Sequence, residues 1–277
     1  MHANLPIAFW KMNGAGNDFI VIDHRKPLIP VEQMAEFARL VCRRKFSVGA
    51  DGLFLLEPSQ VADFRWRFFN ADGSEAEMCG NGARCVARFA YMNGLAAARM
   101  RFETLAGIID ASVADTQVTI RMPAPHSLQL DVEVEAAGQG WTVHSVNTGV
   151  PHLVVFVDDL DRVDVDALGR TFRYHARFAP AGTNVNFVAR DKERLAIRTY
   201  ERGVEAETMA CGTGATAAAV VAVARGLAAS PVQLTTRGGV PLRVQFSGDG
   251  PAADHVLLRG PAHVVYRGEL TVEALVE

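Results

Sequence analysis

The hydrophobic positions along the chain fall into many short runs separated by turn residues, and few stretches have helical spacing. One helix is predicted over residues 31–41, where apolar residues recur at helical intervals. Many short strands around few helices predict the α+β class and not a doubly wound parallel sheet. The predicted strands cover residues 8–10, 19–22, 53–56, 65–69, 99–103, 108–113 and 117–121 in the first half, and 141–146, 153–157, 186–189, 195–200, 232–235, 242–246 and 255–260 in the second.

The chain has 277 residues, which is comfortable for two domains of about 140 residues each. The segment Met122-Pro123-Ala124-Pro125 has turn chemistry and lies near the midpoint. We therefore expect an N-terminal domain over residues 1–124 and a C-terminal domain over residues 125–277, and we leave open a return of the last strand to the first domain.

A self-comparison reveals an internal repeat. The segment CGNGA, which begins at Cys79, recurs as CGTGA at Cys211, and each is followed by a helix-like stretch that ends at a glycine fifteen residues after the cysteine. These glycines, Gly94 and Gly226, are predicted C-caps. Duplication explains the helices and the glycines, but it does not require a cysteine in both copies, so we interpret the two thiols as functional.

A cysteine at a helix start has a larger thiolate fraction than an ordinary cysteine, and the unpaired N–H groups there bind anions. Two such helix starts could hold one carboxylate between them. One thiolate would then take a proton from one face of the adjacent carbon while the other thiol delivers a proton to the opposite face. The helix ends would stabilise the negative charge that flows into the carboxylate. The pattern therefore favours stereoinversion by two acid/base groups.

Composition removes other classes of protein. The chain is 49% hydrophobic with a net charge of −3 and no charged tail, so we expect neither a nucleic-acid partner nor a membrane surface. The longest apolar run, residues 215–224, is too short to span a bilayer, and no secretory signal is evident, so we expect a cytoplasmic protein. Four cysteines are too few for a disulfide scaffold, and their spacing matches no zinc site, so no metal is expected.

Cofactor motifs are weak or missing. Residues 212–217 fit the dinucleotide pattern G-x-G-x-x-A, but the chain from 215 to 248 holds no acidic residue for a ribose. No P-loop or G-x-S-x-G motif occurs, and Lys11 lacks a phosphate-binding motif that would suit pyridoxal phosphate. We therefore expect no cofactor.

Six segments resemble the diaminopimelate epimerases, which are cofactor-independent two-cysteine amino-acid racemases. The resemblance implies two pseudo-symmetric domains, each a roll or barrel of strands wrapped around a central helix, with the active site in the interdomain cleft. It also implies interconversion of L,L- and meso-diaminopimelate, a step toward lysine and peptidoglycan precursors, and is compatible with a homodimer. The matching segments are KMNGAGNDFIVID (11–23), RRKFSVGADGL (43–53), FFNADGSEAEMCGNGARC (68–85), GVPHLV (149–154), AGTNVNFV (181–188) and YERGVEAETMACGTGAT (200–216).

The resemblance also implies roles for single residues. In the L,L to meso direction Cys211 would accept the proton and Cys79 would donate one, with His152 and Glu201 in support. An arginine suits a carboxylate and a glutamate suits an ammonium group, as a substrate with two amino-acid heads requires. Cys42 and Cys85 would be packing residues. The implied substrate contacts are Asn17, Asn70, Gly80, Asn81, Asn184, Glu201, Arg202, Gly212 and Thr213.

Two positions depart from the family pattern: Val150 stands where many members have asparagine, and Gly52 where some have glutamine. Both departures concern recognition of the distal head of the substrate. Two alternatives stay open. The chain could be a related racemase of another amino acid, of the proline or histidine type, or a non-catalytic binding homologue.

Overall fold

The computed structural model describes residues 5–191, 194–248 and 253–276 of the chain. The chain divides into two compact units. Unit 1 comprises Met1–Ile120 and Pro261–Glu277, and unit 2 comprises Arg121–Gly260. The first division falls close to the residue 124 expected from the sequence. The C-terminal segment belongs to unit 1, however, so unit 2 is shorter than the expected 125–277.

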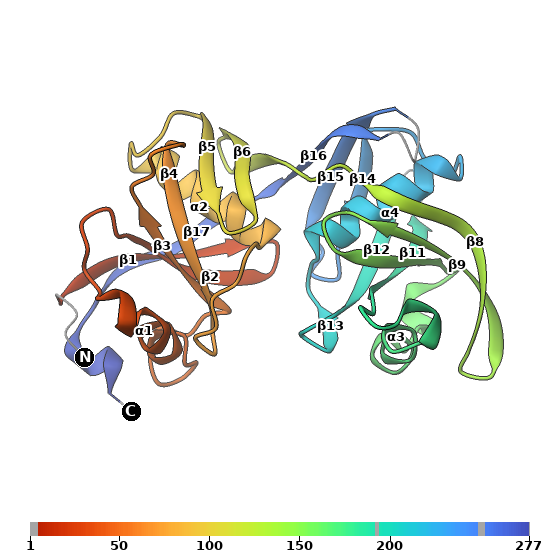
Figure 1. The fold of residues 1–277 in the computed structure, drawn as a ribbon, viewed down its shortest axis with the longest axis horizontal. Coiled ribbons are helices and arrows are strands. Elements are labelled where there is room, and N and C mark those ends of the chain that lie inside the picture. The colour runs from red at the N-terminus through yellow and green to blue at the C-terminus, as the bar shows by residue number, and fades with distance from the viewer. Residues whose placement is uncertain (1–4, 192–193, 249–252, 277) are drawn as a thin grey trace. The chain divides into compact units, whose positions relative to one another are not determined.

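Unit 1 is a mixed sheet with two α-helices (Figure 1). Its strands pair in the order β17-β1-β2-β3-β4-β5-β6-β7, where β2–β3 and β4–β5 are parallel and the other pairs are antiparallel. The pairing of β17 with β1 places the C-terminal strand in this unit. The elements are β1 (Ile7–Gly14), β2 (Asn17–Asp23), η1 (Val31–Gln33), α1 (Met34–Val41), β3 (Gly52–Glu57), β4 (Phe64–Asn70), α2 (Gly80–Met92), β5 (Arg99–Thr104), β6 (Gly107–Ala114), β7 (Gln117–Arg121), β17 (His263–Leu270) and η5 (Val272–Leu275).

Unit 2 has the same plan. Its strands pair in the order β8-β9-β10-β11-β12-β14-β15-β16, with β13 also on β12, and β10–β11 and β12–β14 are the parallel pairs. The elements are β8 (His126–Ala136), β9 (Gln139–Asn147), β10 (Pro151–Phe156), η2 (Leu160–Arg162), α3 (Val165–Arg173), η3 (Ala176–Phe178), β11 (Asn184–Asp191), β12 (Arg194–Glu201), β13 (Ala206–Thr208), α4 (Gly212–Ala224), β14 (Val232–Thr235), β15 (Pro241–Ser247) and β16 (Asp254–Pro261).

Apart from the short strand β13, which unit 2 adds before its long helix, the two units repeat one order of elements: two strands, a short helix, two strands, a long helix and three strands. In each unit the second strand is parallel to the third, and the fourth is parallel to the strand that follows the long helix. An additional strand, β17 or β8, pairs with the first strand of the repeat. The α+β class and the two pseudo-symmetric domains expected from the sequence are confirmed.

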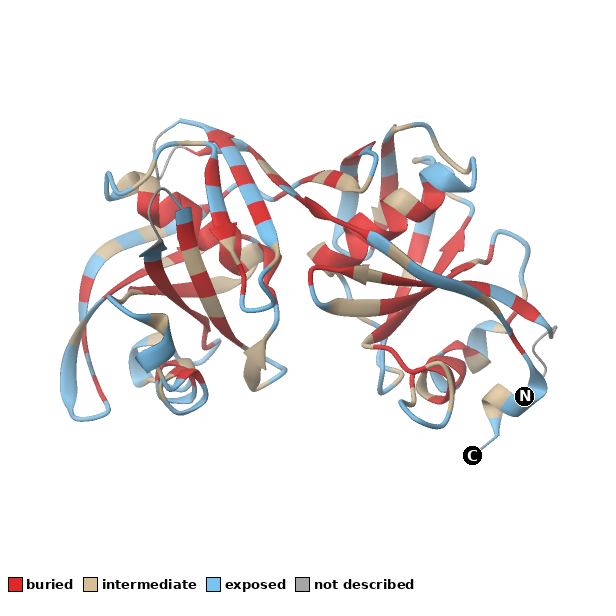
Figure 2. Ribbon diagram, turned by 180° about the vertical axis from the view of Figure 1, so that it is seen from behind, coloured by how far each residue is buried: buried red, intermediate tan, exposed pale blue. Residues whose placement is uncertain are grey.

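The long helices α2 and α4 lie in the cores of their units (Figure 2). Ten of the thirteen residues of α4 are buried, as expected of a helix that is apolar on every side. It packs against β9, β10 and β11 on one side and against β14 and β15 on another, while α2 packs against β1, β2 and β6. Gly94 and Gly226 follow these helices with φ of 66° and 67°, the left-handed conformation of a C-cap glycine. Within the described ranges, no helix is both long and apolar enough to cross a membrane.

Several elements were not predicted. The strand β8 alternates apolar and polar residues, so its signal was present in the sequence; its pairing with β9 is irregular, with positive φ at Ser127 and Asp131. The helix α3 carries a recognisable start, because the Asp164 carboxylate accepts the N–H of Ala167 at 3.0 Å.

Candidate functional site

The two cysteines of the repeat occupy the same local position. Cys79 is the N-cap of α2 and Cys211 is the N-cap of α4, both with extended backbone. The first N–H groups of each helix therefore follow directly after a thiol. The predicted carboxylate-binding residues form these first turns: Gly80 and Asn81 in α2, and Gly212 and Thr213 in α4.

The two sulfur atoms have different neighbours. Cys79 Sγ accepts the backbone N–H of Gly82 at 3.4 Å, as a helix-capping side chain does. Cys211 Sγ lies 3.3 Å from the hydroxyl oxygen of Thr213. Each thiol is thus held at a helix N-terminus, but by a backbone donor in unit 1 and beside a hydroxyl in unit 2.

The second glycine of each C-G-x-G segment is required for packing. A Cβ at Gly82 would lie 2.2 Å from the ring of Phe54, and a Cβ at Gly214 would lie 2.2 Å from Asn186 Oδ1. The first glycine of α2 has more room, since a Cβ at Gly80 would meet nothing closer than 3.8 Å. Gly82 and Gly214 therefore let their helices approach the sheet closely.

In unit 1, two predicted substrate contacts are joined by a hydrogen-bond network. Arg84 Nη2 donates to Asn81 Oδ1 at 2.7 Å, and Asn81 Nδ2 donates to Asn17 Oδ1 at 2.7 Å. Asn17 Nδ2 in turn donates to Asp51 Oδ2 at 3.0 Å. Because the network begins at a cation that only donates and ends at a carboxylate that only accepts, the orientation of both amides is fixed. Because an amide nitrogen carries two protons, Asn17 keeps donor capacity for a substrate carboxylate.

The cation of this network is fully buried. Arg84 also donates to the carbonyl oxygens of Gly80 at 3.3 Å and Pro261 at 3.4 Å. Burial lowers the pKa of Arg84, and the nearby Cys85 and Cys79 raise it. Because Arg84 donates to the carbonyl oxygen of Gly80, its charge lies close to the start of α2. Among the residues that the structure describes, Arg84 has no ion-pair partner.

The acidic end of the network is anchored by two cations. Arg44 pairs with Asp51 at 2.8 Å and with Asp18 at 2.5 Å, and Lys11 pairs with Asp18 at 2.8 Å. Burial tends to raise the pKa of Asp18, but hydrogen bonds from Arg44 and Lys11 lower it below its usual value. Lys11 thus serves in a structural ion pair.

Asn70 lies apart from this network in the described contacts. It is the last residue of β4, it is exposed, and its Nδ2 donates to Ser74 Oγ at 3.0 Å within the turn of residues 70–74.

The packing around position 52 accounts for its glycine, because a Cβ there would lie 2.7 Å from the ring of Phe68 and from a backbone oxygen.

In unit 2 the predicted residues gather at the ends of β10, β11 and β12. His152 on β10 is directly paired with Asn184 on β11. Asn184 Oδ1 accepts the backbone N–H of Arg202 at 2.7 Å, and Arg202 Nη1 donates to the carbonyl oxygen of Ala181 at 3.0 Å. Glu201 ends β12, and burial raises its pKa. An amide, a guanidinium and a carboxyl group are therefore brought together at one edge of the unit.

Three polar residues of the site were not predicted: Arg84, Asn186 and Thr199. Each is buried next to a predicted site residue or its helix. The signal for Asn186 was present in the sequence, because an asparagine between valine and phenylalanine in an apolar strand must find buried partners.

The remaining cysteines differ from the helix-capping pair. Cys42 and Cys85 are buried, and burial raises the pKa of each thiol to about 12. Neither thiol would ionise near neutral pH, which fits the packing role expected for them.

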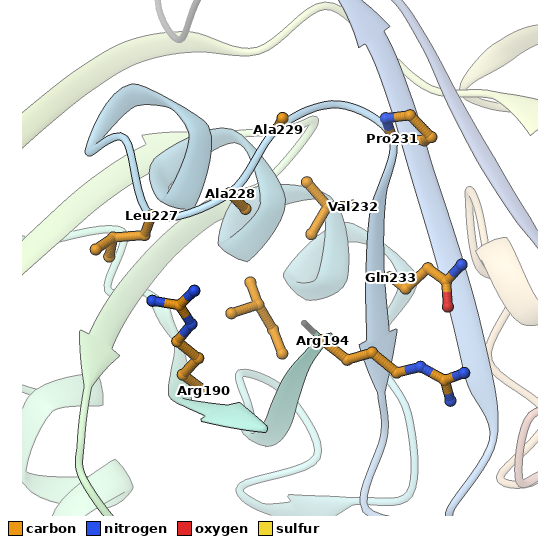
Figure 3. A pocket seen from close by; sticks show the side chains of 9 residues that line it. Arg190, Arg194, Leu227, Ala228, Ala229, Pro231, Val232 and Gln233 are labelled. Carbon is orange, nitrogen blue, oxygen red and sulfur yellow. The ribbon is translucent and has the colours of Figure 1, made fainter. Parts of the chain in front are cut away.

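A cavity of about 450 Å³ lies elsewhere in unit 2, between the start of β12, the end of β11 and the segment after α4 (Figure 3). None of the predicted site residues lines it. Its lining consists of Arg190, Arg194, Leu195, Leu227, Ala228, Ala229, Pro231, Val232 and Gln233.

The family model that matches this chain and two relatives with similar sequences carry the same name. The family model described as diaminopimelate epimerase matches residues 9–126 and 144–265. A protein of Hydrogenobaculum sp. (strain Y04AAS1) named diaminopimelate epimerase is 46% identical, over 95% of this chain and 98% of its own length. One from Aquifex aeolicus (strain VF5) with the same name is 45% identical, over 96% of this chain and 99% of its own length.

Solved structures with this fold are more distant in sequence. A Bacillus anthracis protein of the PhzF family is 17% identical with a TM-score of 0.71, over 96% of this chain and 99% of that one. A probable proline racemase from Agrobacterium radiobacter K84, with bound carbonate, is 16% identical with a TM-score of 0.71, over 96% of this chain and 93% of that one. These likenesses support the two-domain fold.

Proposed function

Because the chain belongs to the diaminopimelate epimerase family, we propose that it is an isomerase that interconverts L,L- and meso-diaminopimelate through two thiols and without a cofactor. The observation that carries the proposal is the equivalent placement of Cys79 and Cys211, each at the N-cap of a buried helix. We further propose a cytoplasmic enzyme that acts as a homodimer on this small amino-acid substrate.

The reaction requires removal of a proton from one face of the α-carbon and delivery of a proton to the other. In the L,L to meso direction, Cys211 as thiolate takes the proton and Cys79 as thiol donates one. The carbanion is stabilised by charge transfer into the α-carboxylate. The first N–H groups of α2 and α4 are preorganised donors that would suit that charge, and at Gly80 the nearest contact of a Cβ would be 3.8 Å away, which leaves room at the backbone.

The other predicted residues suit the remaining groups of the substrate. Asn17 and Asn81 offer oriented amides, and Arg202 offers a guanidinium to the distal carboxylate. Asn70 and Asn184 can bind either polar group of that head. Glu201 would accept the ammonium group, and His152 would assist near the thiols.

Solvent isotope exchange tests the reaction itself. Incubation of the enzyme with L,L-diaminopimelate in deuterium oxide should produce the meso isomer with deuterium at the inverted α-carbon, because the donating thiol exchanges with solvent. Proline and histidine enantiomers serve as one-headed controls and should not be inverted. Inversion of a one-headed amino acid without action on diaminopimelate would favour a related racemase, and no exchange with any of them would favour a binding protein.

Substitution of the thiols tests the assignment of the acid and the base. Cys79→Ala and Cys211→Ala should each lower the rate of epimerisation by a factor of about 10² to 10⁴, the range for loss of a general acid or base. Cys42→Ala and Cys85→Ala are matched controls of the same chemical change and should turn over nearly as fast as the parent once folded. Near-normal turnover by either Cys79→Ala or Cys211→Ala would contradict the two-thiol mechanism.

A further inference from the structure

Three buried polar side chains, His152, Asn186 and Thr199, form a cluster beneath the first turn of α4. They are 1%, 0% and 3% exposed, and they lie on the adjacent strands β10, β11 and β12. Asn186 reaches the helix itself, because a Cβ on Gly214 would lie 2.2 Å from Asn186 Oδ1. A substitution of Asn186 would therefore alter the contacts of His152 and the packing of α4, the helix that carries Cys211.

The orientation of the Asn186 amide follows from its partners. Its nitrogen lies 2.8 Å from the carbonyl oxygen of Leu153, which can only accept a hydrogen bond. Its oxygen lies 3.0 Å from Thr199 Oγ1, whose hydroxyl can donate. The side-chain nitrogen and oxygen of Asn186 are thus distinguished by the network around them.

This orientation decides the protonation of His152. The second N–H of Asn186 Nδ2 points to His152 Nδ1, 3.1 Å away, so that ring nitrogen must accept and cannot carry a proton. A neutral imidazole then carries its proton on Nε2. Burial, and after it the charge of Arg202, lowers the pKa of His152 to about 3, which fits a neutral ring. His152 Nε2 is buried and has no hydrogen-bond partner among the described residues.

We propose that Asn186, backed by Thr199, is a positioning residue that holds His152 as the Nε2–H tautomer, so that His152 meets the reacting groups as a hydrogen-bond donor and not as a base. The role of His152 toward the substrate rests on the proposed function, but the tautomer does not. As a donor, the Nε2–H could stabilise a thiolate or the developing carboxylate charge, whereas it could not accept a proton from the α-carbon.

Nitrogen NMR of the intact protein labelled with ¹⁵N-histidine tests the tautomer directly, because protonated and unprotonated ring nitrogens give distinct signals. The chain supplies both references. His144 Nδ1 accepts the backbone N–H of Asp131 at 3.0 Å, so His144 is an Nε2–H tautomer. His24 Nε2 accepts the backbone N–H of Ile29 at 3.1 Å, so His24 is an Nδ1–H tautomer. His152 should show the pattern of His144, and the pattern of His24 would overturn the proposal.

Two sets of variants test the positioning. In Asn186→Asp the carboxylate cannot donate, so His152 should lose the His144 pattern, and kcat/KM should fall about 10- to 100-fold, as when the orientation of a functional histidine is lost. Thr199→Ser keeps the hydroxyl donor and should preserve both pattern and activity, whereas Thr199→Val should weaken both. Retention of the His144 pattern at full activity in Asn186→Asp would overturn the proposal.

The design separates this inference from the proposed function. The NMR signals require no substrate, so the tautomer stands or falls whether or not the protein acts on diaminopimelate. Unchanged signals of His24 and His144 report that a variant is folded. If Asn186→Asp does not fold, the parent spectrum and the Thr199 pair still decide the question.

Discussion

Beneath the first turn of α2 lie aromatic rings, whereas the corresponding positions beneath α4 carry polar side chains. In unit 1, Gly82 packs on Phe54, whose ring stacks on Phe68 with centroids 4.4 Å apart and meets Phe19 edge-on at 5.2 Å. These three side chains lie on the adjacent strands β2, β3 and β4. The helix of Cys79 thus rests on phenylalanine rings, side chains that carry no hydrogen-bonding groups.

In unit 2 the equivalent side chains form a hydrogen-bonded cluster. Gly214 packs on Asn186, which is paired across the strands with Thr199 and bonded to His152. The strand register places them on β10, β11 and β12 just as the phenylalanines lie on β2, β3 and β4. The same backbone arrangement therefore presents apolar side chains beneath α2 and hydrogen-bonded polar side chains beneath α4.

For the helices the contrast is reversed: α2, which lies on apolar rings, carries a charged residue, and α4, which lies on polar side chains, carries an uncharged one. Five residues after each cysteine, α2 has the buried cation Arg84, whereas α4 has Thr216, whose hydroxyl donates to the Gly212 carbonyl at 3.0 Å. Unit 1 thus combines apolar rings beneath the helix with a charge in the helix, and unit 2 combines neutral polar side chains beneath the helix with an uncharged helix start. The helix and its thiol are thus alike in the two units, while their electrostatic surroundings differ, as the opposite acid and base roles proposed for the two thiols would require.

The largest effect should come from removing that charge. Arg84→Met removes three hydrogen bonds, to the carbonyl oxygens of Gly80 and Pro261 and to Asn81 Oδ1, so the free energy of unfolding should fall by about 3 kcal/mol. The KM should also rise, because Asn81 and Asn17 lose their fixed orientation. The matched change in unit 2, Thr216→Val, removes one hydroxyl bond and should cost about 1 kcal/mol.

Urea unfolding of both variants measures these costs, and initial rates measure KM. Equal losses in the two units would show that the buried charge does not distinguish them. An unchanged KM in Arg84→Met would mean that the hydrogen-bond network from Arg84 to Asn17 does not contribute to substrate binding.

The sequence predicted most of the fold because the repeat and the short apolar runs are local signals. It could not predict the partners of the last strand, since pairing of β17 with β1 joins segments far apart in the chain. It missed α3 although Asp164 and the spacing of Val165, Leu168 and Phe172 mark an amphipathic helix.

The site was predicted unevenly for a similar reason. Residues in contiguous motifs, such as Cys79 to Asn81, were identified directly. The buried partners were not, because Asn186 and Thr199 become meaningful only when strand register places them side by side. A motif identifies the groups that meet a substrate, whereas the groups that orient them depend on long-range pairing.

A second test concerns the fit of each helix on the side chains beneath it. Gly82→Ala forces a Cβ to within 2.2 Å of the stacked Phe54 ring and should cost about 2 kcal/mol. Gly80→Ala, two residues earlier, is the matched control and should be nearly neutral in stability, because its nearest contact would be 3.8 Å away.

The double variant Gly82→Ala/Phe54→Leu should recover part of the loss, which urea unfolding in a double-mutant cycle would measure. In unit 2, Gly214→Ala should displace Asn186 and so disturb activity as well as stability. Equal stability of Gly80→Ala and Gly82→Ala would contradict the packing role of the second glycine.

The smallest effect, and the one confined to unit 2, is a pH dependence of stability from His152. The unfolded chain binds a proton on this histidine near its ordinary pKa of about 6.5, whereas the folded chain binds one only near pH 3. Between these values the unfolded state holds more protons, so stability is lost as the pH falls, by about 1.4 kcal/mol per pH unit. Urea unfolding at pH 6 and pH 5 should therefore show a larger decrease for the parent than for His152→Gln, with His144 common to both. If the free energy of unfolding fell equally in the two proteins, His152 would already be charged in the folded state. The polar cluster beneath α4 would then not be neutral.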